Sequence, residues 1–198
     1  MKKPSVVVVA GNGRTCASEV ISRVLKQFFR AGEQILIFDV KNEEIKNFEF
    51  FLKRSPRAIL VITHIGNIPS DIDFFAGEME EIKEIINLAK RLPAQTNLIL
   101  NFDDETVRGI NDITNLNTLT FGFQEKADFR ATDVKSNRGT NLKINFRGNI
   151  VPFWLEGIFG KEQIYSVLAT VAVGSVLNLN LVEISQTLKN YQPQRGDT

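Results

Sequence analysis

Short apolar runs alternate with stretches of helical periodicity over the first two thirds of the chain. Runs rich in Val, Ile, Leu and Phe predict five strands, at residues 5–10, 34–40, 58–63, 97–101 and 118–121. Between these runs, apolar residues recur at three- and four-residue spacing, which predicts helices at residues 15–30, 42–54, 77–91 and 104–113. Short apolar strands that alternate with helices are typical of a parallel sheet covered on both faces.

The pattern changes after about residue 126. Three partly alternating segments at residues 127–134, 141–146 and 150–155 predict an antiparallel meander, and two helical segments follow, at 163–177 and 182–191. We therefore expect a single α/β domain, a three-layer sandwich with a mostly parallel P-loop-type sheet plus a small antiparallel β region. Its parts are a parallel core at about 1–125, the antiparallel addition at about 126–157 and a C-terminal helical pair at about 161–191.

Composition narrows the class of protein. The chain has 198 residues, 43% of them hydrophobic, and a net charge of +1, so neither nucleic acid nor an anionic membrane is an expected partner. Cys16 is the only cysteine and His64 the only histidine, which excludes an intrachain disulfide and a multi-histidine metal site. The apolar run near the N-terminus is too short for a signal peptide or a membrane span, so we expect a cytoplasmic protein.

The strongest candidate for chemistry is the glycine-rich turn after the first apolar run. Gly11, Asn12 and Gly13 are followed by a cation, Arg14, and a hydroxyl, Thr15, where the first helix opens. Such a turn brings backbone N–H groups together on an anion, and the helix dipole adds partial positive charge. In a P-loop the cation is Lys and another Gly opens the motif, whereas here Val8 is at that opening position. An ordinary β–α turn is the alternative interpretation.

Ligands of parallel sheets bind beyond the carboxyl ends of the strands. The positions of interest are therefore the turn at 11–15, Asp39, residues 63–66 and residues 101–104.

Seven short motifs occur in a fixed order along almost the whole chain. They are Val9-Ala-Gly-Asn-Gly-Arg-Thr15, Phe38-Asp39, Ile62-Thr-His-Ile-Gly66, Asp73-Phe-Phe-Ala-Gly-Glu-Met-Glu80, Leu100-Asn-Phe-Asp-Asp104, Phe121-Gly122 with Ala127-Asp128, and Gly160-Lys-Glu-Gln-Ile-Tyr-Ser-Val-Leu-Ala169. In number and order they resemble the central ATP-binding domain of the Mur ligase family. These are ATP-dependent amide-forming ligases of peptidoglycan (cell-wall) precursor synthesis.

The resemblance implies ATP and Mg²⁺ as cofactors. Family members phosphorylate a substrate carboxylate with ATP, and an amine then attacks the acyl phosphate. By position, the nucleotide contacts would be Gly11, Asn12, Gly13, Arg14, Thr15, Asn101, Asp103, Asp104 and Ser166. The Mg²⁺ ligands would be Thr15, Asp39 and Asp71. For the acidic residues, helix caps or solvated loop carboxylates are the alternative.

Several positions depart from the family pattern. His64 replaces an Asn, Glu162 replaces a His and Ser166 replaces an Asn that contacts adenine. Ile86 falls where the family commonly carries a carbamylated Lys, and Asp71 lies nearest to a lost metal-binding His. The segment between the first helix and the Asp39 strand is also much shorter than in the family.

Three functional readings remain open from the residues. The first is an ATP-binding domain of a ligase that is inactive alone and is completed by further domains or by a partner chain. The reason is that neither the family's UDP-substrate domain nor its third domain is recognisable in the sequence. The second is a degenerate, non-catalytic relative that serves as a structural or regulatory interaction module. The third is a small P-loop kinase or GTPase-like switch. Apolar surface around Trp154 and Phe159 is expected to be exposed and to favour self-association.

Overall fold

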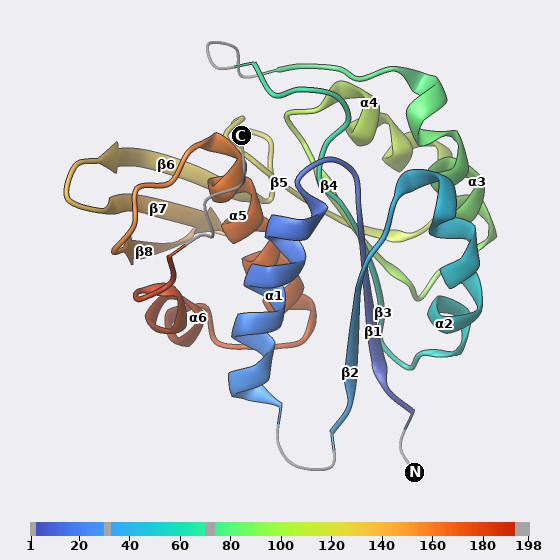
Figure 1. Cartoon of the computed structure of the whole chain (residues 1–198), viewed down its shortest axis with the longest axis horizontal. Coiled ribbons are helices and arrows are strands. Elements are labelled where there is room, and N and C mark those ends of the chain that lie inside the picture. The colour runs from blue at the N-terminus through green and yellow to red at the C-terminus, as the bar shows by residue number, and fades with distance from the viewer. Residues whose placement is uncertain (1–2, 30–32, 70–73, 193–198) are drawn as a thin grey trace.

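One continuous sheet of eight strands organises the molecule (Figure 1). The computed structural model describes residues 3–29, 33–69 and 74–192. In spatial order the strands are β2 (Ile35–Asp39), β1 (Ser5–Ala10), β3 (Ala58–Ile62), β4 (Asn97–Asn101), β5 (Asn117–Gly122), β6 (Phe129–Ser136), β7 (Thr140–Phe146) and β8 (Asn149–Leu155). All pairs from β2 to β6 are parallel, and the last two are antiparallel.

Strand β1 lies inside the parallel part of the sheet and is buried along its whole length. Val8 lies opposite Phe38 of β2 and Leu60 of β3, so the three strands end at the same level. Because side chains alternate along a strand, Val7 and Val9 face one core and Val6 and Val8 face the other. This explains why the run of four valines is uniformly apolar rather than alternating.

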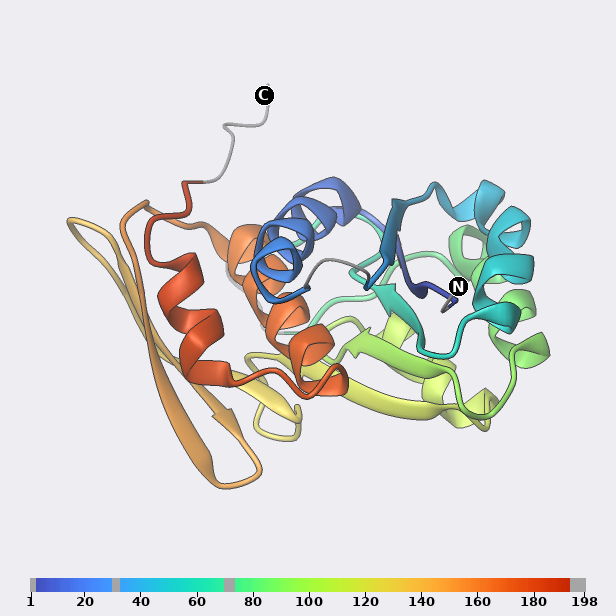
Figure 2. The ribbon, with the colours of Figure 1, turned by 90° about the horizontal axis from the view of Figure 1, so that it is seen from below.

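Helices α1 (Arg14–Phe28), α5 (Lys161–Val176) and α6 (Leu181–Leu188) cover one face of the sheet (Figure 2). Helix α5 is buried on nearly all sides because it lies between the sheet, α1 and α6. Its apolar residues therefore surround the helix instead of forming one stripe.

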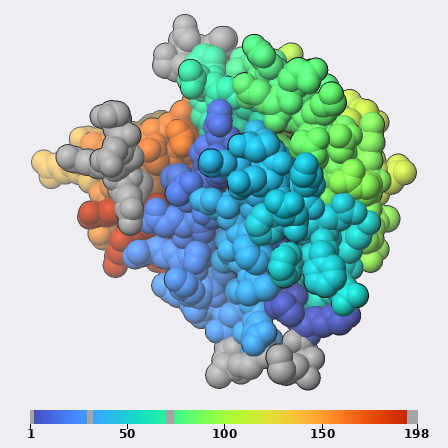
Figure 3. All heavy atoms as spheres, turned by 45° about the vertical axis from the view of Figure 1, so that its right-hand side comes forward, coloured from blue at the N-terminus to red at the C-terminus, as the bar shows by residue number. Residues whose placement is uncertain are grey.

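The opposite face is covered by shorter helices, which Figure 3 shows from outside in cyan and green. They are the 3₁₀ turns η1 (Asn42–Phe48), η2 (Met79–Ile82) and η3 (Gly109–Ile113) and the α-helices α2 (Glu49–Arg54), α3 (Lys83–Arg91) and α4 (Glu105–Arg108). The helices predicted at 42–54, 77–91 and 104–113 are thus each part 3₁₀ and part α. With helices on both faces, the predicted three-layer α/β fold is confirmed.

The predicted meander forms strands β6, β7 and β8, which extend the same sheet. Strand β6 joins through a short parallel contact with β5, at Phe121 opposite Phe129. Inside this region the rings of Phe129 and Phe146 stack with centroids 4.0 Å apart. Trp154 on β8 is 41% exposed, as expected, but the expectation for Phe159 was wrong because its side chain is only 3% exposed and packs against Tyr191.

Two consecutive buried carboxylates follow β4. Asp103 accepts hydrogen bonds from the backbone N–H groups of Phe123 and Gln124 and from the Tyr165 hydroxyl, at 2.8–3.1 Å. Asp104 caps α4 by accepting from Thr106 and Val107. These bonds tie the end of β4 to the β5–β6 loop, to α5 and to α4.

None of the helices in the described parts of the chain is long and apolar enough to cross a membrane.

Gly122 is where the packing around Asp103 leaves no room for a side chain. A Cβ at Gly122 would lie 2.6 Å from Asp103 Oδ1, so we expect Gly122→Ala to displace this carboxylate and cost about 1–3 kcal/mol of unfolding free energy. Gly109→Ala is the matched control, because a Cβ at Gly109 meets nothing within 4 Å. Urea unfolding of both variants measures the difference. Equal stability of the two would contradict this account of Asp103.

Candidate functional site

The carboxyl ends of the parallel strands meet at one edge of the sheet, at the top of Figure 1. There β1 runs through the glycine-rich loop into α1, and residues 63–66 follow the neighbouring strand β3. This common edge is where ligands of open α/β sheets bind.

The loop needs both of its glycines. Gly11 and Gly13 have φ angles of +96° and +75°, in the left-handed region that favours glycine. A Cβ at Gly11 would also lie 2.6 Å from the Thr63 hydroxyl. The sequence pattern Gly-Asn-Gly therefore reflects a backbone conformation and a close approach of two strand ends.

Side chains and backbone from neighbouring segments hold this loop. The Gly11 N–H donates to Asn42 Oδ1 at 3.0 Å, and the Asn12 N–H donates to the His64 carbonyl at 2.7 Å. The Thr63 hydroxyl contacts the carbonyl oxygens of Ala10 and Asn12. Contacts from the segments after β2 and β3 thus help to fix the shape of the loop.

Thr15 and Asp39 are brought together although 24 residues separate them. The Thr15 hydroxyl donates to Asp39 Oδ2 at 2.7 Å, which leaves the lone pairs of the hydroxyl oxygen free to bind a cation. Hydroxyl and carboxylate oxygens are the ligands that Mg²⁺ accepts in proteins. The third predicted ligand, Asp71, lies outside the described residues.

Arg14 does not extend beyond the loop. Its Nη1 donates to the Gly11 carbonyl at 3.3 Å, and its Nε lies 4.0 Å from Asp39 Oδ1. The guanidinium is therefore directed at the loop backbone and at the carboxylate that pairs with Thr15.

A cleft of about 550 Å³ opens beside the loop, a volume in the range of small-molecule sites. It is lined by Asn12, Gly13, His64, Gly66, Asn67, Ile68, Pro69, Lys161, Glu162 and Gln163. A Cβ at Gly13 would lie 2.9 Å from His64 Cε1 and 3.0 Å from Glu162 Oε1, so both side chains adjoin the first residue of the helix N-terminus. Sequence reasoning did not assign either side chain to the site, although His64 lies in the segment 63–66 that follows a strand end.

Four predicted nucleotide contacts lie away from this cleft. Asn101, Asp103 and Asp104 are completely buried, and both carboxylates bind backbone N–H groups. Ser166 is 2% exposed, and its hydroxyl donates to the Glu162 carbonyl within α5. All four are buried in this structure, and none of them lines the cleft.

Burial also sets the protonation of these groups. Desolvation raises the pKa of Asp103 and Asp104 from the ordinary carboxyl value, against the opposing effect of their N–H donors. Desolvation lowers the pKa of His64 to about 4, so this imidazole is neutral at pH 7.

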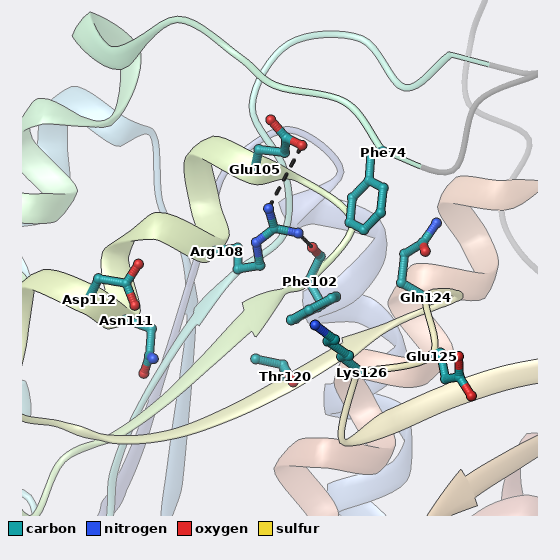
Figure 4. A pocket seen from close by; sticks show the side chains of 10 residues that line it. All are labelled: Phe74, Phe102, Glu105, Arg108, Asn111, Asp112, Thr120, Gln124, Glu125 and Lys126. Carbon is teal, nitrogen blue, oxygen red and sulfur yellow. Dashed lines mark hydrogen bonds and ion pairs between the residues drawn. The ribbon is translucent and has the colours of Figure 1, made fainter.

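A second cavity lies elsewhere, between α4 and the β5–β6 loop (Figure 4). Its volume is about 660 Å³. Phe74 and Phe102 form its aromatic wall, and the Arg108 guanidinium lies about 5 Å from both ring centroids. Gln124 and Lys126 of the β5–β6 loop also line it. This cavity shares no lining residue with the cleft at the loop.

The sequence profile of the Mur ligase middle domain matches residues 6–174. This chain belongs to the Mur ligase family. It is 32% identical over 147 residues to a UDP-N-acetylmuramate–L-alanine ligase of Sulfurihydrogenibium sp., covering 72% of this chain and 30% of the relative. A ligase of the same name from Dictyoglomus turgidum is 27% identical over 209 residues, covering 96% of this chain and 44% of that one. Membership of the Mur ligase family argues against the hypothesis of a small P-loop kinase or GTPase-like switch.

Solved structures of Mur ligases share the fold. The UDP-N-acetylmuramoylalanyl-D-glutamyl-2,6-diaminopimelate–D-alanyl-D-alanyl ligase of Acinetobacter baumannii superposes with a TM-score of 0.75 at 17% identity, covering 98% of this chain and 47% of that chain. The MurF ligase of Thermotoga maritima in complex with ADP gives a TM-score of 0.73 at 18% identity, with 98% and 50% covered. The chain thus spans half or less of the length of these Mur ligases.

The burial of His64 predicts that the unfolding free energy of this domain depends on pH. Its pKa is about 4 in the folded state and about 6.5 unfolded, so the unfolded state binds more protons between these values. We expect the unfolding free energy to fall by up to roughly 3 kcal/mol through this group as the pH drops from 6.5 to 4.

The measurement is urea unfolding at several pH values, compared with His64→Asn. Asp103 and Asp104, with raised pKa, contribute an opposite slope, but they are present in both proteins and cancel in the difference. Parallel pH profiles of the two proteins would contradict the burial of a neutral His64.

Proposed function

We propose that this chain is an ATP- and Mg²⁺-binding domain of the Mur ligase type. The observation that carries the proposal is the contact between Thr15 and Asp39 at the start of α1, directly after the two left-handed glycines. This combination puts cation-binding oxygens next to the N–H groups of a helix N-terminus.

The phosphate half of such a site fits the residues present. Gly13, the N-cap residue of α1, has no side chain to cap the helix, and backbone N–H groups at a helix start attract phosphate. A Mg²⁺ ion would be held by the Thr15 hydroxyl, with Asp39 acting directly or through water, because this ion retains several waters in proteins. Bound there, Mg²⁺ neutralises phosphate charge.

The cleft of residues 66–69 and 161–163 is the proposed location of the rest of the nucleotide. It adjoins the loop at Asn12 and Gly13, and its volume suits a small ligand. The side chains of Lys161 and Gln163 contribute hydrogen-bond donors to it.

The ligase reaction of the family, in which ATP phosphorylates a carboxylate and an amine displaces the phosphate, is proposed to need protein regions beyond this domain. Ile86, at the position expected for a carbamylated Lys, lies on α3 and packs with the core on the far side of the sheet. Arg14 is directed at Gly11 and Asp39. The described residues therefore supply positioning for nucleotide phosphates rather than a complete set of reacting groups.

A second candidate is a non-catalytic interaction module. Two observations favour it: the Ser166 hydroxyl is occupied within α5, and a large cavity with a half-exposed aromatic wall lies apart from the loop. Self-association through the exposed side chains of Ile150 and Trp154 on β8 belongs to this alternative. Sedimentation at rising protein concentration tests it, and a constant monomer mass would count against self-association.

The decisive experiment is calorimetric titration with ATP and ADP, with and without Mg²⁺. We expect Mg²⁺-dependent binding by the wild type. For Gly13→Asp we expect binding to be at least about 100-fold weaker, which is a loss of about 2.7 kcal/mol of binding free energy. The reason is that a carboxylate would lie beside the bound phosphates.

The matched control is Gly148→Asp. Gly148 also has a left-handed φ, +79°, but lies in the β7–β8 turn with no atom within 4 Å of an added Cβ. It therefore reproduces the backbone strain without approaching the loop. Unchanged affinity in Gly13→Asp, with normal circular dichroism, would rule out the phosphate site.

Arg14→Lys tests the role of the loop cation. An ammonium on a flexible stem lacks the planar guanidinium that donates to Gly11 and lies near Asp39, so we expect it to turn toward the phosphates. We expect ADP with Mg²⁺ to bind about five- to tenfold more tightly, which is a gain of about 1–1.4 kcal/mol of binding free energy. Arg57→Lys, at an exposed position, serves as the control. Weaker binding in Arg14→Lys would show that the guanidinium itself holds the nucleotide.

A further inference from the structure

His64 is fastened to the glycine-rich loop by its backbone. It follows β3, and its carbonyl accepts the Asn12 N–H at 2.7 Å in an isolated antiparallel bridge. The side chain is 4% exposed. The resemblance to the family predicts Asn at this position, and His64 is not among the proposed Mg²⁺ ligands. A buried imidazole here therefore has no role in the site described so far.

The ring lies against the residue that begins the helix. A Cβ on Gly13 would be 2.9 Å from His64 Cε1, so only glycine lets the ring approach this closely. Nδ1 of the ring is buried and has no hydrogen-bond partner within the described parts of the chain. A buried, unpartnered polar atom next to a helix N-terminus is unusual, because such atoms are normally satisfied.

The loop attracts an anion but directs its own cation elsewhere. Helix α1 is 15 residues long, and its N-terminus carries partial positive charge and free N–H groups. The Arg14 guanidinium donates to the Gly11 carbonyl and lies 4.0 Å from Asp39. A phosphate at the loop would therefore have the His64 imidazole as a nearby group able to gain a positive charge.

Charged groups reach His64 from each neighbouring element. Glu162 and Lys161 of α5 line the same cleft, Arg14 follows Gly13 on α1, and Asp104 accepts the N–H of Ile65 next to His64. The Phe75 ring packs edge-on with its centroid 6.2 Å away. In the free protein desolvation dominates and keeps the ring neutral, with a pKa of about 4.

We propose that His64 takes up one proton when a phosphate group binds at the loop, and that the resulting imidazolium stabilises the bound phosphate. This inference rests on the proposed nucleotide site and adds to it a group that replaces the charge of the redirected Arg14. The proton comes from solvent and is released again when the phosphate leaves. A nearby dianion favours the charged form of an imidazole, so affinity for phosphate-bearing ligands rises as the pH falls below neutrality.

Nuclear magnetic resonance tests the proposal directly, because the chain has a single histidine and its Cε1–H resonance needs no assignment. The resonance is titrated with pH in the free protein and with saturating ADP and Mg²⁺. We expect the midpoint to rise by at least about two pH units with ligand, which corresponds to a 100-fold preference of the ligand for the protonated protein. Adenosine, which lacks phosphate, should leave the midpoint unchanged.

Calorimetry supplies the second readout. ADP with Mg²⁺ is titrated into wild type and His64→Asn at pH 6 and pH 8, in two buffers of different ionisation enthalpy. Proton release or uptake by the phosphates themselves is common to both proteins. The difference in the number of protons taken up on binding therefore reports the proton on His64. We expect extra proton uptake and a steeper loss of affinity with rising pH only in the wild type.

The outcomes separate this inference from the proposed function. Binding of ADP with an unchanged histidine resonance, or with equal proton uptake in His64→Asn, overturns the role of His64 and leaves the nucleotide site intact. Absence of binding at both pH values overturns both. A raised midpoint with ADP but not with adenosine supports the proposal.

Discussion

Two adjacent buried carboxylates, Asp103 and Asp104, hold together the segments around the candidate site. Side chains alternate along a strand, so the two point to opposite faces of the sheet. Asp103 joins the β5–β6 loop to Tyr165 of α5, while Asp104 joins the first turn of α4 to Ile65 after β3. Their desolvation is unfavourable, but removing either would leave several buried N–H groups without acceptors.

The same principle governs the glycine-rich loop. Its N–H groups at Gly11 and Asn12 are bound by Asn42 and by the His64 carbonyl, and the Thr63 hydroxyl supports its carbonyls. Contacts from two neighbouring strand ends therefore hold the loop in one shape. For the proposed phosphate site, such pre-organisation would lower the entropy lost on binding.

Charge is distributed around the loop differently from the usual P-loop. Arg14 Nη1 donates to the Gly11 carbonyl, and Arg14 Nε lies 4.0 Å from Asp39 Oδ1. Burial keeps His64 neutral, and Glu162 brings a carboxylate close to Gly13. The arrangement of Arg14 and His64 around the helix N-terminus is therefore the basis of the proposed proton uptake.

The fold followed largely from local patterns. Uniform apolar runs and helical periodicity predicted the parallel strands and their covering layers, because burial on both faces leaves a plain signature in sequence. The 3₁₀ turns were missed because their amino-acid composition differs little from that of an α-helix. The two differ in their backbone hydrogen bonds, which join residues i and i+3 in a 3₁₀ turn. Phe159 was misplaced because exposure depends on a distant partner, Tyr191.

For the candidate site, the sequence by itself predicted the glycines, Thr15 and Asp39, because residue types able to bind phosphate and Mg²⁺ follow strand ends. Only the tertiary structure decided that Asp103 and Asp104 are internal anchors, since a carboxylate after a strand serves ligand or backbone equally well until its neighbours are known. It also decided that His64 adjoins Gly13. Contacts between residues 51 positions apart depend on how β1 and β3 pair, and no local pattern records that pairing.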